Sequence, residues 1–194
     1  MGLESVRERE LLDQIEGIIL AEGFQHLRVG GLASRLHCSR TTLYLLAPSK
    51  DELVLRVISR WADAGVADAE AKSVAGESAA EKVLVYIDTV RVWLDQASPE
   101  FWRDLDAREP ARRMWDDICA RAADSVRGYL DAGIEDGSIR PLNSVYVATV
   151  IWLAARATRD TDLLDRAGLT SSGVLGELGR FLRSGLSEPT QSSG

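Results

Sequence analysis

Capping boxes are the feature of this 194-residue sequence that most constrains its fold. In the pattern Ser-x-x-Glu, the serine oxygen accepts a hydrogen bond from a free backbone N–H of the first helical turn, and the glutamate returns one. The pattern occurs at residues 5–8, 49–52 and 78–81. Each copy is followed by apolar residues spaced three and four apart, which is typical of amphipathic helices. The sequence therefore predicts an all-α protein.

The same spacing predicts the remaining helices and their order. We expect helices over residues 6–22, 29–36, 40–45, 49–72, 81–97, a short one from 99, 110–135, 144–158 and 173–186. The start of 144–158 alternates β-branched residues and would also fit a buried strand. Its length of about 15 residues exceeds that of most strands, so we interpret it as a helix that is apolar on all sides. Asp160, Asp162 and Asp165 are interpreted as part of a solvated loop.

Composition excludes several classes of protein. Hydrophobic residues make up 45% of the chain and charged residues 27%, which is ordinary for a folded domain and too apolar for disorder. The longest apolar run, 145–155, is shorter than the roughly 20 residues that span a bilayer, so no membrane contact is expected. The first ten residues carry no apolar signal core. With only Cys38 and Cys119 as thiols, we expect a cytoplasmic protein without disulfides.

Charge is distributed unevenly along the chain. The net charge of −7 lies entirely in residues 61–194, because residues 1–60 carry equal numbers of acids and bases. No acid occurs between Glu22 and Asp51, whereas Arg28, Arg35, Arg40 and Lys50 fall in or at the end of that window. A phosphate backbone responds to local positive charge. Two short helices joined by a three-residue turn inside this window indicate a helix-turn-helix DNA-binding motif.

The residues of this window resemble a known family. The matching residues are Gly23-Phe24, Val29, Leu32-Ala33, Ser39, Leu43-Tyr44 and Ser49-Lys50. In their spacing they are similar to the DNA-binding domain of the tetracycline-repressor (TetR) family, over about residues 5–65. Residues 66–194 resemble the family only in their general helical pattern.

The resemblance implies an N-terminal three-helix helix-turn-helix domain and a larger C-terminal helical domain for ligand binding and dimerisation. On this basis we expect the DNA-binding domain at 1–48, with the motif at 29–48. A connecting helix would occupy 49–72, the C-terminal domain 73–187 and a tail 188–194.

Five positions depart from the family pattern. Arg28 stands where the family has a threonine or serine cap for the second helix, and an arginine cannot cap it. His37 replaces the glycine of the turn, although histidine tolerates a left-handed backbone better than most residues. Thr41 replaces a glycine of the recognition helix, and Leu46-Ala47 replace a His-Phe pair.

Roles in DNA binding follow from position and resemblance. Arg40, Thr41 and Thr42 open the third helix and should face base edges, since arginine can read guanine and a threonine methyl can touch thymine. By resemblance, Tyr44 and Lys50 should hold phosphates. A packed aromatic ring for Tyr44 and a solvated surface charge for Arg40 are the alternatives. The full candidate set is Arg28, Ser39, Arg40, Thr41, Thr42, Tyr44 and Lys50.

Aromatic residues concentrate in the second part of the chain. All five tryptophans lie beyond residue 60 and indicate either a large helical core or an aromatic pocket. The resemblance favours a pocket that senses a small, mostly apolar molecule, with Trp102 as a candidate lid. The candidate ligand-binding residues are Tyr86, Trp93, Trp115, Cys119 and Trp152. No cofactor is expected, and His26, His37 and Cys38 are not spaced as zinc ligands, so no metal is expected either.

Helices 144–158 and 173–186 are expected to form a homodimer contact, in which the small face of Gly173, Gly176 and Gly179 meets the partner. The resemblance thus implies a ligand-responsive transcriptional regulator, which we expect to be a repressor released from a palindromic double-stranded DNA operator by a small apolar molecule, although the residues themselves do not separate repression from activation. With no recognisable catalytic motif, it is not expected to be an enzyme. The alternative left open is a small helical enzyme or ligand-binding protein with a vestigial helix-turn-helix.

Overall fold

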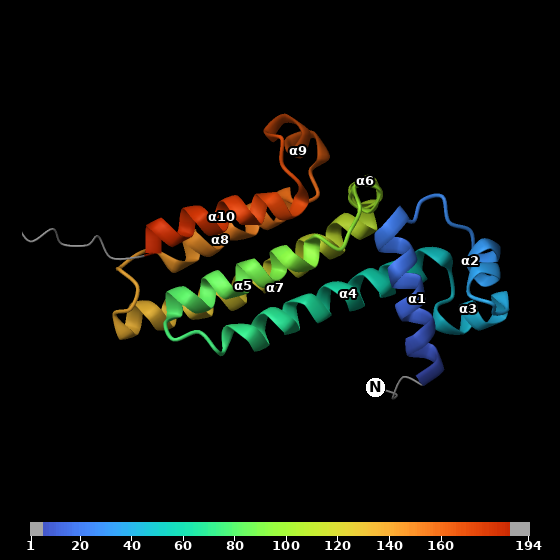
Figure 1. Cartoon of the computed structure of the whole chain (residues 1–194), viewed down its shortest axis with the longest axis horizontal. Coiled ribbons are helices and arrows are strands. Elements are labelled where there is room, and N and C mark those ends of the chain that lie inside the picture. Colours follow the sequence, from blue (N-terminus) through green and yellow to red (C-terminus); the bar gives the residue numbers. More distant parts are fainter. Residues whose placement is uncertain (1–5, 187–194) are drawn as a thin grey trace, which may run out of the picture. The chain divides into compact units, whose positions relative to one another are not determined.

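The computed structural model describes residues 6–186, and within this range the chain folds into ten helices (Figure 1). The all-α prediction is confirmed. Ser5, which opens the first predicted capping box, and the predicted tail from 188 lie outside the described residues. The helices are α1 (Val6–Glu22), α2 (Val29–Arg35), α3 (Arg40–Leu46), α4 (Lys50–Ser73), α5 (Ala79–Leu94), α6 (Pro99–Ala107), α7 (Glu109–Asp136), α8 (Ser144–Ala157), α9 (Thr161–Ala167) and α10 (Ser171–Leu186).

Side-chain caps set the start of most helices. The side chains of Ser39, Ser78, Ser98 and Asn143 each accept a hydrogen bond from the backbone N–H three residues further on, over 2.9–3.2 Å. Ser49 does the same for Glu52 at 3.1 Å. Each bond satisfies one of the N–H groups that a helix leaves unpaired at its N-terminus. The segment 144–158, ambiguous between strand and helix in the sequence, is the helix α8.

Helix α9 was missed by the sequence analysis, and the expectation of a solvated loop there was wrong. Asp160 is the N-cap of this helix, accepting a bond from the Leu163 N–H at 2.9 Å. Gly168 ends the helix at φ 64°, in the left-handed conformation that glycine adopts without strain. Leu164 is buried. The helix is therefore stabilised by a cap at each end and by one buried leucine, and its aspartates are exposed.

The chain divides into two compact units. The first comprises residues 1–63 and 96–114, which include α1 to α3, the beginning of α4, and α6. Its core contains an aromatic cluster, in which the Phe101 ring lies 5.5 Å from Trp61, 5.0 Å from Trp102 and 6.1 Å from Phe24, each edge to face. Trp102 is thus buried in the core of this unit, and the role of its short helix as a lid over the ligand site stays a prediction.

The second unit comprises residues 64–95 and 115–194. Its helix α10 packs against α5 and α8 (Figure 1). Cβ atoms added at Gly176 and Gly179 would lie 3.5 Å from Arg91 Cδ and 3.8 Å from Ile87 Cγ2, both on α5. The small face of α10 therefore lies against α5 of the same chain, at distances that would also accommodate alanine, and the expectation that this face meets a second subunit was wrong.

Two further observations limit the chemistry of the described residues. No helix between residues 6 and 186 is both long and apolar enough to cross a membrane. Within the same range, no three histidine, cysteine or acidic side chains are grouped so that they could hold a metal ion.

Candidate nucleic-acid interface and ligand site

The turn between α2 and α3 depends on a left-handed histidine. His37 has φ 49°. Its N–H bonds to the Ser34 carbonyl at 3.3 Å, and the Cys38 N–H bonds to the Ala33 carbonyl at 3.0 Å. This pair of bonds is a Schellman motif, which ends a helix on a left-handed residue, usually glycine. His37 therefore does in this turn what the family's glycine would do, as the sequence predicts.

Helix α3 begins at this turn and is fixed at both ends. Ser39 caps it through the Thr42 N–H at 3.0 Å, and the two hydroxyls lie 2.8 Å apart. At the other end, the Arg56 guanidinium donates to the Leu46 carbonyl at 2.6 Å. Leu43 is buried, and so is Leu46. Because the apolar side of this short helix is held in the core, its opposite side is presented outward in a defined orientation.

The candidate DNA-binding residues lie at or beside that outward side. Arg28, Ser39, Arg40, Thr41 and Tyr44 are exposed, while Thr42 and Lys50 are half-buried. Arg28 holds the N-cap position of α2 without a capping hydrogen bond, as expected for arginine.

Arg40 takes a position that the sequence did not indicate. A Cβ added at Gly30 would lie 2.8 Å from Arg40 Nη2 and 3.2 Å from its Cζ. The Arg40 guanidinium therefore lies beside the backbone of α2 at Gly30, where a residue with a Cβ would require the Arg40 side chain to shift.

Lys50 is held by the loop that follows α1. Its Nζ donates to the Gln25 carbonyl at 3.1 Å. Partial burial, and then the neighbouring Arg108, lower the pKa of Lys50 below its ordinary value. The N–H groups of Phe24 and Gln25 donate to Asp104 Oδ2 on α6, at 2.6 and 2.7 Å. Lys50, which is expected to hold a DNA phosphate, is thus positioned by the Gln25 carbonyl. Gln25 is in turn held by Asp104 of α6 through its own N–H group.

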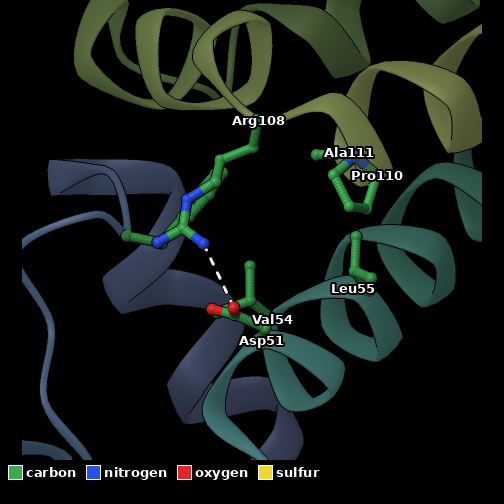
Figure 2. A pocket seen from close by; sticks show the side chains of 7 residues that line it. Asp51, Val54, Leu55, Arg108, Pro110 and Ala111 are labelled. Atoms are coloured by element: carbon green, nitrogen blue, oxygen red, sulfur yellow. Dashed lines mark hydrogen bonds and ion pairs between the residues drawn. The ribbon is translucent and has the colours of Figure 1, made fainter.

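A small cavity lies beside this arrangement (Figure 2). Arg108 reaches across it to Asp51, with Nη1 3.1 Å from Oδ2. The cavity volume is about 50 Å³, whereas ligand pockets usually measure about 300–1,000 Å³. We therefore attribute no ligand to it. Asp104 and Arg108 were not identified from the sequence, because they lie about 80 and 57 positions from the residues they bind.

Three of the candidate ligand-binding residues lie in the interior of the second unit. Tyr86 on α5 and Trp115 and Cys119 on α7 are all buried. The Tyr86 ring lies 6.3 Å from that of Tyr129. Burial raises the pKa of the Tyr86 phenol well above its ordinary value and that of the Cys119 thiol to about 12. Both groups are therefore neutral at physiological pH.

The other two candidates lie in different surroundings. Trp93 is half-buried, donates its indole N–H to Asp68 Oδ2 at 3.0 Å and packs beside Gly65, where an added Cβ would lie 3.1 Å from the ring. Trp152 lines a groove of about 170 Å³ between α7 and α8. Its indole N–H donates to the Asp116 carbonyl at 3.4 Å. The structure thus groups Tyr86, Trp115 and Cys119 and gives Trp93 contacts with α4.

An ion-pair network borders the Trp152 groove. Asp116 Oδ1 accepts hydrogen bonds from Arg156 and Arg159, each at 2.9 Å. The Arg156 guanidinium also lies 4.9 Å from the centre of the Trp152 ring, within the range of a cation–π contact. Burial acts to raise the pKa of Asp116, but the two arginines outweigh it and hold that pKa below its ordinary value.

Comparison with known proteins gives matches in structure only. No protein-family model matches the chain, and no curated protein matches it in sequence. FadR from Bacillus subtilis, a transcriptional regulator solved with stearoyl-CoA, has a TM-score of 0.71 at 17% identity, over 92% of this chain and 98% of that one. A candidate transcriptional regulator from Saccharomonospora viridis, solved with choline, has a TM-score of 0.71 at 17% identity, over 93% and 97% of the two chains.

A third structure carries the family name. PfmR from Thermus thermophilus, a TetR-family transcriptional regulator, has a TM-score of 0.61 at 18% identity, over 92% of this chain and 99% of that one. The chain therefore has the fold of TetR-family regulators along nearly its whole length, and the resemblance seen in residues 5–65 is confirmed at the level of the fold.

Proposed function

We propose that this protein is a homodimeric, ligand-responsive transcriptional regulator, acting as a repressor, that binds a palindromic DNA operator through α2 and α3. The observation that carries the proposal is the outward face of α3, fixed by the Ser39 cap and the His37 turn in a stretch of sequence without acids. The solved proteins that share the fold and are described above are transcriptional regulators, which favours this function over an enzyme.

DNA binding is tested by fluorescence anisotropy with duplexes covering the intergenic regions beside the gene. Arg28→Ala removes an exposed cation at the start of α2, so it should weaken binding to all sequences alike. The slope of log affinity against log salt should fall by about 0.9, the effect of one phosphate contact. Lys50→Ala should act in the same way. Arg113→Ala, which removes an exposed cation from α7, is the matched control and should leave the slope unchanged.

Failure of this test has a clear form. Wild-type protein that shows no salt-dependent binding to any duplex, or Arg28→Ala and Lys50→Ala variants that bind as the wild type does, would refute the proposed interface. Arg40→Ala should instead relax discrimination at one base position, at a cost of about 1–3 kcal/mol there. An effect spread evenly over all positions would assign Arg40 to the phosphates.

The proposed dimer uses the apolar side chains that α8 and α10 leave exposed. Val145, Tyr146 and Leu153 on α8 are at least half exposed, and Phe181 on α10 is 70% exposed. These helices pack against each other, so the exposed side chains extend over two neighbouring elements. Helices that expose this much apolar surface are typical of contacts with another subunit, and an isologous dimer would place the two recognition helices about 34–36 Å apart, one turn of DNA.

Light scattering at micromolar concentration tests the dimer. Phe181→Glu should give a monomer, because a dimer would bury an unpaired charge. Val74→Glu, at an equally exposed position (76%) in the loop between α4 and α5, is the control and should remain dimeric. A monomeric wild type rules the proposal out.

For the ligand we propose an apolar molecule held by burial among α5, α7 and α8, around Tyr86 and Cys119. The two ligands named for solved relatives, stearoyl-CoA and choline, differ widely in chemistry, so the fold does not specify the ligand. Acyl-CoA thioesters of increasing chain length, with choline as a second probe, are therefore titrated against tryptophan fluorescence and against bound DNA.

Trp93 connects this proposal to the DNA-binding unit. It donates to Asp68 of α4, and α4 contributes residues to both compact units. Trp93→Ala should abolish ligand-induced release while leaving operator affinity nearly intact, and Trp93→Phe should retain part of the response. If no probe quenches the fluorescence or releases DNA, or if Trp93→Ala responds fully, the proposed sensor is refuted.

A further inference from the structure

The outward face of α3 is apolar, which is unusual for a surface proposed to contact DNA. Thr41, Tyr44 and Leu45 are exposed and lie three and four positions apart, which places them on one side of the helix. Leu45 is 80% exposed and Tyr44 50% exposed. A leucine this exposed has no burial within the chain to account for it.

Charge is absent from this face. Between His37 and Lys50 the only charged side chain is that of Arg40, and its guanidinium lies over Gly30 of α2. Guanine is read by arginine or lysine and adenine by asparagine or glutamine. None of these residue types stands among Thr41, Tyr44 and Leu45.

Positively charged residues flank α3 in the sequence. Arg28 is exposed at the start of α2 and Lys50 follows α3, in a stretch of 27 residues, 24–50, that contains no acid. The surroundings therefore suit a polyanion, while the face suits an apolar group. In the major groove the apolar group is the C5-methyl of thymine.

We propose that Leu45, together with the methyl group of Thr41, recognises thymine methyl groups in the operator half-site, so that A·T pairs are selected there by apolar contact. This inference rests on the proposed function and deepens it. Leu45 is then a specificity-determining residue, whereas Arg28 and Lys50 supply affinity without discriminating between bases.

The test begins with a selection of bound sequences from a random duplex library by the wild-type protein. Each thymine of the enriched half-site is then replaced singly by deoxyuridine, which removes only the methyl group and keeps base pairing. At one or more positions the wild type should bind about fourfold more weakly, the factor that corresponds to burying one methyl group. Leu45→Ala should bind the thymine and deoxyuridine duplexes equally at that position.

Two variants serve as controls. Leu45→Met keeps an apolar side chain of similar volume and should keep the discrimination. Thr41→Ser keeps the hydroxyl and loses the methyl, so it should lose discrimination at a neighbouring thymine only. Leu45 is exposed, so thermal unfolding followed by circular dichroism should give Leu45→Ala a Tm close to that of the wild type.

The outcomes separate this inference from the proposed function. If the selection enriches no sequence, DNA recognition itself is refuted. If a sequence is enriched but no deoxyuridine substitution weakens binding, or if Leu45→Ala discriminates as the wild type does, thymine-methyl recognition is overturned while the DNA-binding function stands. Discrimination by Leu45→Ala equal to that of the wild type would also be expected if Leu45 contacted another protein.

Discussion

Removing the Asp104 carboxylate should destabilise the first compact unit more than the loss of any exposed carboxylate. Asp104 on α6 accepts hydrogen bonds from the N–H groups of Phe24 and Gln25 at 2.6 and 2.7 Å. Gly23 precedes them at φ 74°, and a Cβ there would lie 2.5 Å from Asp104 Oδ2. The loop after α1 is therefore built around this carboxylate, and Asp104→Ala leaves two N–H groups without their acceptor.

The magnitude follows from the exposure of the two donors. A hydrogen bond to a charged group contributes about 1.5–3 kcal/mol. The bond from Phe24 is partly buried, whereas that from Gln25 is exposed to water. The contribution of the Gln25 bond should therefore lie at or below the low end of this range. We expect Asp104→Ala to lower the free energy of unfolding by about 3 kcal/mol, which for a chain of this size lowers Tm by about 6–12 °C. Asp104→Asn keeps an acceptor oxygen and should cost about 1 kcal/mol.

Thermal and urea unfolding followed by circular dichroism measure these losses. Asp88→Ala is the matched control, because its carboxylate is two-thirds exposed and pairs with Arg91 in its own helix, and such pairs contribute about 0.3–0.5 kcal/mol. Gly23→Ala should also lower the free energy of unfolding. The double variant Gly23→Ala/Asp104→Ala should lose less than the sum of the two single losses, because alanine at 104 removes the clash between a Cβ at position 23 and Asp104 Oδ2. A change in Tm below about 2 °C for Asp104→Ala, or strict additivity, would refute the reasoning.

The remaining predictions concern three other positions. Gly133→Ala should destabilise by about 1–3 kcal/mol, since its Cβ would lie 2.5 Å from a side-chain atom of the α5 start; Gly128→Ala on the same helix has open space and should stabilise by up to about 1 kcal/mol. The lowered pKa of Asp116 means that its ion pairs stabilise the fold above the unfolded-state pKa of about 3.9 and that this contribution is lost as pH falls through the folded-state pKa. The difference in unfolding free energy between wild type and Asp116→Asn should therefore be constant from about pH 5 to 8 and shrink below about pH 4; a difference that grows in acid would contradict this. His37→Gly should raise stability by about 1 kcal/mol, because glycine adopts φ 49° without the cost that a side chain imposes; a lower Tm would show that the imidazole makes a stabilising contact.

Local chemistry made much of the fold predictable. Helix periodicity and side-chain caps depend on residues three or four apart, so the caps at Ser49, Ser78 and Asn143 could be identified from sequence. The left-handed turn at His37 was predictable for the same reason. Helix α9 also carries a local signal, an aspartate cap and a terminal glycine. Its three aspartates fit a solvated loop equally well, so the sequence did not predict the helix.

Packing between distant segments could not be predicted in this way. The small face of α10 indicated a close helix approach but not which helix would approach, and α5 of the same chain proved to be the neighbour. Trp102 carried no signal for one compact unit over the other, since an aromatic residue suits any core. Arg40 was predicted at base edges because of its place in the motif, whereas its position beside Gly30 of α2 depends on a three-dimensional neighbour that the sequence did not indicate.

The proposed DNA-binding surface comes from one stretch of sequence, but the residues that hold it in place do not. Residues 23–50 supply the turn, the cap and the exposed face, whereas Asp104 and Arg108 come from the segment 96–114, which belongs to the same compact unit. That segment lies in the chain between α5 and the part of α7 that belongs to the second unit. Short covalent connections therefore join α6 to α5 and to α7. The hydrogen bonds from Phe24 and Gln25 to Asp104 end on α6, so the loop after α1 is held by the one helix that lies in the chain between α5 and α7.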